Sequence, residues 1–272
     1  MNKQLLHSIS GCAAAAMLFF TVSCKKANNT VQPVSEKNAT ARAATVAGDT
    51  ILNATYENNS LNSGYPLITP TEASAADAVY MVSPGATGNY AVAHKVVAGD
   101  SSYFSAGNWR SESALMKPGP ARFSPGQERR YEFSMLLKDF PVSQAEKSEQ
   151  FTLFQLKNSA EGGALRIIRK GNTIQTARAG NTFHDLLVSN FAPYVNQWMH
   201  FRIDVKWAED NTGYMKIYTK LPGQTTYTMV LDAENCKTYF GGIGYLKWGV
   251  YNPPLGSTRI VYHDDIRIIA LN

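Results

Sequence analysis

Residues 245–251 read Tyr-Leu-Lys-Trp-Gly-Val-Tyr, and the alternation in this stretch decides the fold class. Successive side chains of a strand point to opposite faces of a sheet. The core-facing set is Leu246, Trp248 and Val250. The opposite set is Tyr245, Lys247, Gly249 and Tyr251. Glycine has no side chain, so this second face has a gap between polar side chains in which an extended polymer could bind. The alternative is a solvent-exposed face with a glycine at a bulge.

The same alternation recurs in other runs along the chain. Together the runs are 130–137, 151–157, 200–207, 213–221, 243–251 and 258–269. Turn-forming residues separate them, as in Lys170-Gly171-Asn172 and Asp210-Asn211-Thr212-Gly213. The sequence lacks long amphipathic helices, and one short helix is expected around residues 183–188. The pattern therefore predicts an all-β fold, either a two-sheet sandwich or a jelly roll.

The composition indicates one folded domain over most of the chain. Of 272 residues, 44% are hydrophobic, enough for a sizeable core, and 17% are charged, below the roughly 25% that is usual. We expect this domain to span residues 51–272. The net charge of +5 permits an anionic partner such as nucleic acid, lipid or acidic polysaccharide, and selects none of them.

The N-terminus has the features of an export signal. Lys3 precedes an apolar stretch at residues 13–22, which is too short for the ~20 residues that a membrane-spanning helix needs. The stretch ends in Thr21-Val22-Ser23-Cys24, which resembles the bacterial lipobox, although the lipobox prefers leucine where Thr21 stands. We expect a signal peptide over residues 1–23 and lipid modification of Cys24. The alternative is an ordinary signal with an incidental cysteine.

Residues 24–50 are rich in Lys, Asn, Thr, Ala, Ser and Glu without a sustained apolar period, so we expect a flexible tether. A lipoprotein of this design would be anchored to a bacterial envelope membrane. We expect the outer membrane, with the periplasmic and surface-facing sides both open. Cys236 has no expected disulfide partner and is interpreted as structural.

Two further runs place polar side chains on one strand face. In Phe151-Thr152-Leu153-Phe154-Gln155-Leu156-Lys157, alternation buries Phe154 and Leu156 and puts Gln155 and Lys157 on the other face. Arg110 and Glu112 also share a face in the run Trp109-Arg110-Ser111-Glu112. Such a pair is either a surface ion pair or a guanidinium held in place to bind a carboxylate.

Taken together, these segments resemble the polysaccharide lyases of the heparin lyase I and glucuronan lyase type. The strongest are Gly244 to Tyr251 and Val261-Tyr262-His263-Asp264-Asp265-Ile266-Arg267-Ile268. The supporting segments are Trp109 to Glu112, Arg130 to Ser134, Phe154-Gln155 and Trp198 to Phe201. The likeness spans most of residues 105–270.

This resemblance implies a concanavalin-like jelly-roll β-sandwich whose concave cleft breaks uronate-containing polysaccharides by β-elimination. By the match, Arg110 and Gln155 would hold the substrate carboxylate, Tyr251 would be the catalytic tyrosine, and Lys247 would be the lysine beside it. Lys247 would then favour a phenolate and attract an anionic chain. Further substrate contacts are expected from Lys157, Glu112, His184 and Tyr245.

The sequence departs from the family at one position. The family strand that contains the glutamine commonly continues to a histidine that assists proton abstraction, and this chain reads Gln155-Leu156-Lys157 there. Lys157 or Tyr251 takes over as the base, or His184 arrives from another segment, or catalysis has been lost. Loss would leave a non-catalytic glycan-binding lipoprotein on the same fold, which is the second hypothesis.

Other functions have less support. A glycoside hydrolase needs two carboxylates flanking the scissile bond, and no run of paired Asp and Glu on one strand face is present. Nucleic-acid binding is not expected, because the basic residues are scattered and the chain is exported. His94 and His200 are interpreted as strand residues. His263, Asp264 and Asp265 lie together, so Asp264 and Asp265 would either bind Ca²⁺ or cap a turn. No metal site is assigned, and a monomer is expected.

Overall fold

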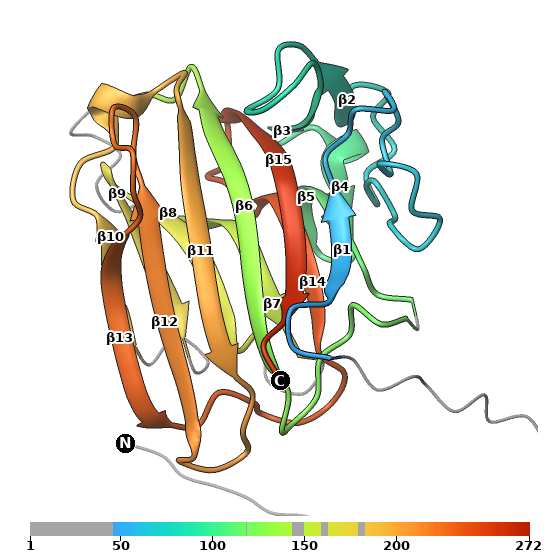
Figure 1. The fold of residues 1–272 in the computed structure, drawn as a ribbon. Helices are drawn as coiled ribbons and strands as arrows, with labels where there is room; N and C mark the ends of the chain where they lie inside the picture. The colour runs from blue at the N-terminus through green and yellow to red at the C-terminus, as the bar shows by residue number, and fades with distance from the viewer. Residues whose placement is uncertain (1–45, 118, 143–149, 159–162, 179–182) are drawn as a thin grey trace, which may run out of the picture. The chain divides into compact units, whose positions relative to one another are not determined.

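The described part of the chain is almost entirely β-structure. The computed structural model describes residues 46–117, 119–142, 150–158, 163–178 and 183–272. Within these ranges there is no α-helix, only the short 3-10 helices η1 (Ser101–Tyr103) and η3 (Ala192–Tyr194). No helix there is long and apolar enough to cross a membrane. The strands form two antiparallel sheets that lie face to face (Figure 1).

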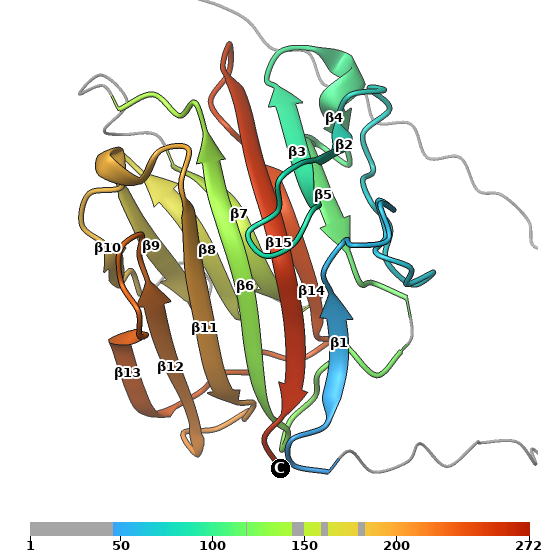
Figure 2. The same ribbon diagram turned by 45° about the horizontal axis from the view of Figure 1, so that its top comes forward.

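One sheet contains eight strands in the order β13-β12-β11-β6-β15-β3-β2, with β1 also paired to β15. Its members are β1 (Thr50–Ala54), β2 (Val79–Val82), β3 (Ala91–Val97), β6 (Glu128–Lys138), β11 (Trp198–Lys206), β12 (Gly213–Lys220), β13 (Thr228–Cys236) and β15 (Thr258–Ala270). The last strand, β15, lies between β6 and β3, so the C-terminal end of the chain lies in the middle of this sheet (Figure 2).

The second sheet contains seven strands in the order β10-β9-β8-β7-β14-β5-β4. Its members are β4 (Phe104–Ser105), β5 (Asn108–Ala114), β7 (Gln150–Lys157), β8 (Leu165–Lys170), β9 (Thr173–Arg178), β10 (Leu186–Val188) and β14 (Tyr245–Tyr251). The β14 strand pairs with β5 on one side and with β7 on the other. Three segments that are far apart in sequence thus become neighbours.

Aromatic rings pack the two sheets together. The Phe133 ring on β6 stacks on the Phe154 ring of β7, with centroids 3.9 Å apart, and lies 5.1 Å from the Phe201 ring of β11. Trp248 on β14 is fully buried, and its Nε1 donates a hydrogen bond of 3.0 Å to the Tyr56 hydroxyl. A buried indole N–H needs such a partner.

The predicted all-β sandwich is confirmed, and each of the six runs coincides with an observed strand to within about two residues at either end. Leu246, Trp248 and Val250 are fully buried, as predicted. The short helix expected at 183–188 is wrong. Phe183 forms a β-bridge with Arg178, and residues 186–188 form β10, because antiparallel pairing with β9 satisfies this backbone.

Asp264 caps a turn. Its Oδ2 accepts hydrogen bonds from the backbone amides of Ala86 at 2.8 Å and Thr87 at 3.4 Å, and its Oδ1 accepts one from the Asp265 amide at 2.7 Å. The described residues contain no cluster of acidic, histidine or cysteine side chains that could hold a metal ion. The turn-capping alternative therefore describes Asp264 in this structure.

The aromatic stack predicts a large loss of stability on truncation. Phe133→Ala removes the ring that lies between the two sheets and should lower the free energy of unfolding by about 3–5 kcal/mol. Leu255, which is 72% exposed, provides a control, and Leu255→Ala should change stability by less than about 0.5 kcal/mol. Urea denaturation measures both values, and equal effects would contradict the stack's assigned role.

The buried Asp264 predicts a pH-dependent stability. Burial, and then the charge of Asp265, raise the pKa of Asp264 from 3.8 to about 7. The folded state then binds the proton more tightly than the unfolded state, so stability falls as pH rises through this interval. The stability of Asp264→Asn relative to the parent should increase by roughly 2–4 kcal/mol between about pH 4 and about pH 8. Urea denaturation at both pH values tests this, with Asp232→Asn on exposed β13 as the control.

Candidate active site

Polar side chains from β5, β7, β8 and β14 meet on the face of the seven-stranded sheet that is turned away from the sandwich core, called the site face below. The strand register places them side by side. Gln155 on β7 lies opposite Lys247 on β14, and Arg110 on β5 lies opposite Tyr251 on β14. These four residues are the ones predicted as catalytic, so the fold brings all of them to one face.

Glu112 is the buried carboxylate of the site face, with only 3% of its surface exposed. Its Oε1 accepts a hydrogen bond of 2.5 Å from the Gln155 Nε2, and its Oε2 lies 3.9 Å from the Lys247 Nζ. Burial raises the pKa of Glu112, and the charge of Lys247 and the Gln155 hydrogen bond oppose that rise. Glu112 therefore orients two other side chains of this face.

Arg110 is held beside Tyr251. Its guanidinium carbon lies 4.9 Å from the centre of the Tyr251 ring. One terminal nitrogen donates to the Glu72 carboxylate at 3.4 Å and the other to the Ala106 carbonyl at 3.1 Å. The buried Nε has no hydrogen-bond partner among the described residues. A fixed guanidinium with an unused donor is well suited to bind a carboxylate.

Two more basic side chains complete this face, and we call Arg110, Lys157, Arg166 and Lys247 the basic cluster. Arg166 on β8 lies opposite Gln155, and its Nη1 is 3.4 Å from the Thr152 hydroxyl. Burial lowers the pKa of Arg166, and the nearby Tyr251 phenol opposes that shift. Arg110, Arg166 and Lys247 are three cations against the carboxylates of Glu112 and Glu72, so the net charge here is positive before any charge on Lys157 is counted.

Gly249 is required by packing. It has φ +141° at a β-bulge, where the register between β14 and β7 shifts. A Cβ atom at Gly249 would lie 2.2 Å from the backbone oxygen of Ser111 and 2.8 Å from the Cα of Glu112. The glycine thus lets β5 approach β14 closely, which explains its presence without any polymer lying over it.

The contacts of Lys247 and His184 differ from those expected, while their roles stay predictions. Lys247 makes no described contact with Tyr251 and is paired with Glu112 instead, while the cations near Tyr251 are Arg110 and Arg166. The His184 side chain is exposed, with Nδ1 3.1 Å from the Thr176 carbonyl, and no described contact joins it to the basic cluster.

Tyr245 does lie on the site face, opposite Lys157. Its side chain is buried, and burial, followed by the charge of Glu112, raises its pKa. Sequence reasoning missed Arg166 and Glu72. The adjacent Ile167 and Ile168 interrupt the alternation around Arg166, and Glu72 lies outside the described strands.

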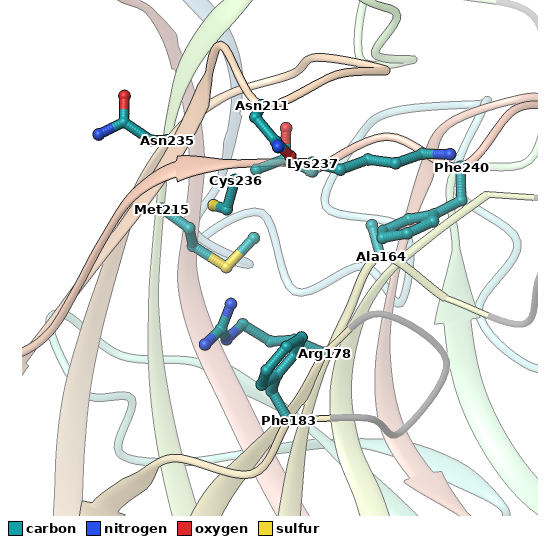
Figure 3. A pocket seen from close by; sticks show the side chains of 10 residues that line it. Ala164, Arg178, Phe183, Asn211, Met215, Asn235, Cys236, Lys237 and Phe240 are labelled. Atoms are coloured by element: carbon teal, nitrogen blue, oxygen red, sulfur yellow. The ribbon is translucent and has the colours of Figure 1, made fainter.

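A separate cavity of about 360 Å³ lies elsewhere, with Arg178 and Phe183 on one side and Met215 and Cys236 on the other (Figure 3). Arg178 is already paired with the Asp185 carboxylate at 2.7 Å. None of the ten described lining residues is a carboxylate, a histidine or a tyrosine. Besides the paired Arg178, its described titratable residues are Cys236 and Lys237, so the site face, which also holds carboxylates and tyrosines, is the better candidate for chemistry.

Comparison with protein families agrees with this arrangement. A family model described as polysaccharide lyase matches residues 47–267. The chain belongs to the polysaccharide lyase family. The predicted family resemblance is thereby confirmed at this level, and the narrower likeness to heparin lyase I stays a prediction.

Solved polysaccharide lyases share the fold of this family member. The endo-β-1,4-glucuronan lyase from the fungus Trichoderma reesei has 20% sequence identity and a TM-score of 0.51, over 70% of this chain and 86% of that one. The marine PL-14 alginate lyase from Aplysia kurodai has 11% identity and a TM-score of 0.52, over 84% and 100% of the two chains. Alginate lyase AlgAT5, from polysaccharide lyase family 7, has 15% identity and a TM-score of 0.52, over 72% and 83%. No curated protein sequence matches the chain.

The buried pairing of Glu112 with Lys247 predicts a coupled effect on stability. Glu112→Leu leaves the Lys247 ammonium, which is 4% exposed, without its counterion and should cost about 3–5 kcal/mol. The double variant Glu112→Leu with Lys247→Met removes both charges and should recover most of that loss. A double-mutant cycle by urea denaturation measures the coupling. A double variant no more stable than Glu112→Leu would show that the two side chains do not act as a pair.

Proposed function

We propose that this polysaccharide lyase cleaves a uronate-containing anionic polysaccharide by β-elimination. The observation that carries the proposal is Arg110, a buried guanidinium with an unused Nε–H donor, held against the Tyr251 ring. A carboxylate-binding group beside a phenol is the pair that this reaction needs at one sugar. Family membership and the fold shared with glucuronan and alginate lyases support the same reaction class.

The elimination begins at the sugar carboxylate. Arg110 and the second N–H of the Gln155 amide would neutralise that carboxylate, so that the negative charge developing on it as C5 loses its proton is stabilised. Glu112 already accepts the other N–H of Gln155 and thereby orients the amide. The binding geometry is therefore largely set before substrate arrives.

Bond cleavage requires a proton for the leaving oxygen. As a base of the site face takes the C5 proton, the C5–H electron pair forms the C4–C5 double bond and the C4–O4 bond breaks. The Tyr251 hydroxyl would donate its proton to O4, which becomes the new chain end. Arg110 and Arg166 lie close enough to stabilise the resulting phenolate.

The basic cluster also suits a polymer that carries repeated negative charge. The cluster extends along β14. Arg110 lies opposite Tyr251 at one end of this strand, and Lys157 lies opposite Tyr245 at the other end. An anionic chain lying along this strand would meet a cation at successive positions, and the excess positive charge would speed its association. We include in the proposal an anchor at Cys24, outside the described residues, which would hold the enzyme at an envelope membrane.

A non-catalytic glycan-binding role is the second candidate. It is favoured by Lys157, which stands where the family commonly has a histidine. The basic cluster would then bind the polysaccharide without breaking it. This candidate predicts retention of the protein on a glycan affinity gel with no new reducing ends.

The decisive assay is ultraviolet absorbance during incubation of the full-length protein with heparin, heparan sulfate, glucuronan, alginate and pectate. Absorbance should rise with one of these, because the new double bond is conjugated to the carboxylate. Tyr251→Phe, which removes only the hydroxyl, should lower kcat by about 100-fold or more. Tyr218→Phe, on the other sheet, should leave kcat unchanged.

The same assay separates the two candidate functions. No absorbance change on any of the five glycans, together with retention on an affinity gel, would replace the lyase with the binding protein. Full activity in Tyr251→Phe would remove Tyr251 from the proton-donating role.

A further inference from the structure

Lys157 differs from the other lysine of the site face in its surroundings. The Lys247 ammonium has the Glu112 carboxylate at 3.9 Å, and both side chains are almost completely buried. The half-buried Lys157 amine makes no hydrogen bond and no ion pair with any described residue. Two lysines on adjacent strands therefore differ chemically, because among the described residues only Lys247 has a counterion.

The charges around Lys157 are mostly positive. Lys247 on β14, Arg110 on β5 and Arg166 on β8 all act on its amine, and Glu112 is the opposing charge. The other side chains of this face near it are Gln155, two residues earlier on the same strand, and Tyr245 opposite. Three neighbouring cations disfavour the charged form of this amine and so favour the neutral form.

The protonation of Lys157 follows from these surroundings. Burial lowers the pKa of the Lys157 amine, the charges of Lys247, Arg110 and Arg166 lower it further, and Glu112 counteracts them in part. A neutral amine has a lone pair and can accept a proton, which a salt-bridged ammonium cannot do. Both features are needed in a general base.

We propose that Lys157 is the general base of the elimination, taking the C5 proton as a neutral amine. This inference rests on the proposed lyase function. The Lys157 Nζ forms a bond to the C5 proton, the C5–H electron pair becomes the C4–C5 double bond, and the C4–O4 pair leaves with the proton of Tyr251. The resulting Lys157 ammonium and Tyr251 phenolate are neutralised by proton exchange with water before the next turnover.

The position of Lys157 fits this role. Gln155, which would bind the carboxylate attached to C5, shares its strand and its face with Lys157. Tyr251 lies toward the opposite end of β14, beyond Lys247 and Gly249. The proton acceptor and the proton donor are therefore different side chains, with Gln155 beside Lys157 and Arg110 opposite Tyr251, so one side chain need not perform both transfers.

The test compares full-length variants on whichever glycan the parent cleaves. Lys157→Arg keeps the positive charge but cannot become neutral, so kcat should fall by about 100-fold or more while KM changes less than about twofold. Lys157→His should recover part of the lost kcat, and the acid limb of its kcat–pH profile should move to lower pH, because the ordinary pKa of histidine is lower. Lys216→Arg, on the other sheet, is the matched control.

The outcomes distinguish this inference from the proposed function. If the parent is active and Lys157→Arg keeps more than about half of kcat, Lys157 only attracts substrate and Tyr251 transfers both protons. If the parent and all variants are inactive on every glycan, the lyase proposal itself fails. A further measurement does not depend on activity: the rate of amine acylation at Lys157, followed by mass spectrometry against pH, should reach half its maximum at lower pH than at Lys216. Equal midpoints would overturn the neutral-amine assignment.

Discussion

The contact between Glu112 and its two partners, Gln155 and Lys247, is the constraint on which the site depends. It joins β5, β14 and β7 through side chains on the face turned away from the core. A buried carboxylate is costly unless it is paired and hydrogen-bonded, so these three side chains keep one arrangement. That arrangement fixes the orientation of the Gln155 amide. Neither Arg110 nor Lys157 forms a described hydrogen bond with Glu112. Both remain available for a ligand.

The bulge at Gly249 makes this contact possible. Since a Cβ atom there would overlap the Ser111 backbone, only glycine allows β5 to pair with β14 at this level. The register shift at the bulge also changes which residue of β7 lies opposite Tyr251, so that Thr152 pairs with it. A backbone irregularity in the middle of a central strand is therefore part of how the site is assembled.

Sequence alone predicted the strands and the faces of their side chains, because alternation is a local property. Alternation placed Leu246, Trp248 and Val250 in the core. The family resemblance, and not alternation, grouped Arg110, Gln155, Lys247 and Tyr251 in one site. Neither predicted that Lys247 pairs with Glu112, or that Arg166 joins from β8, because cross-strand neighbours depend on register between distant segments. The helix expected at 183–188 failed for a related reason, since pairing with β9 overrides local preference there.

Arg110, Arg166 and Lys247 surround the Lys157 amine with positive charge, which opposes protonation of that amine. A glycan-binding protein gains from Lys157 only while its amine is charged, and Lys247, Arg110 and Arg166 all disfavour that charge. The same neighbours favour the neutral amine, which is the form that a lyase needs in a base. The same electrostatic surroundings therefore weaken Lys157 as a binding group and strengthen it as a base, which favours catalysis over simple binding at this site.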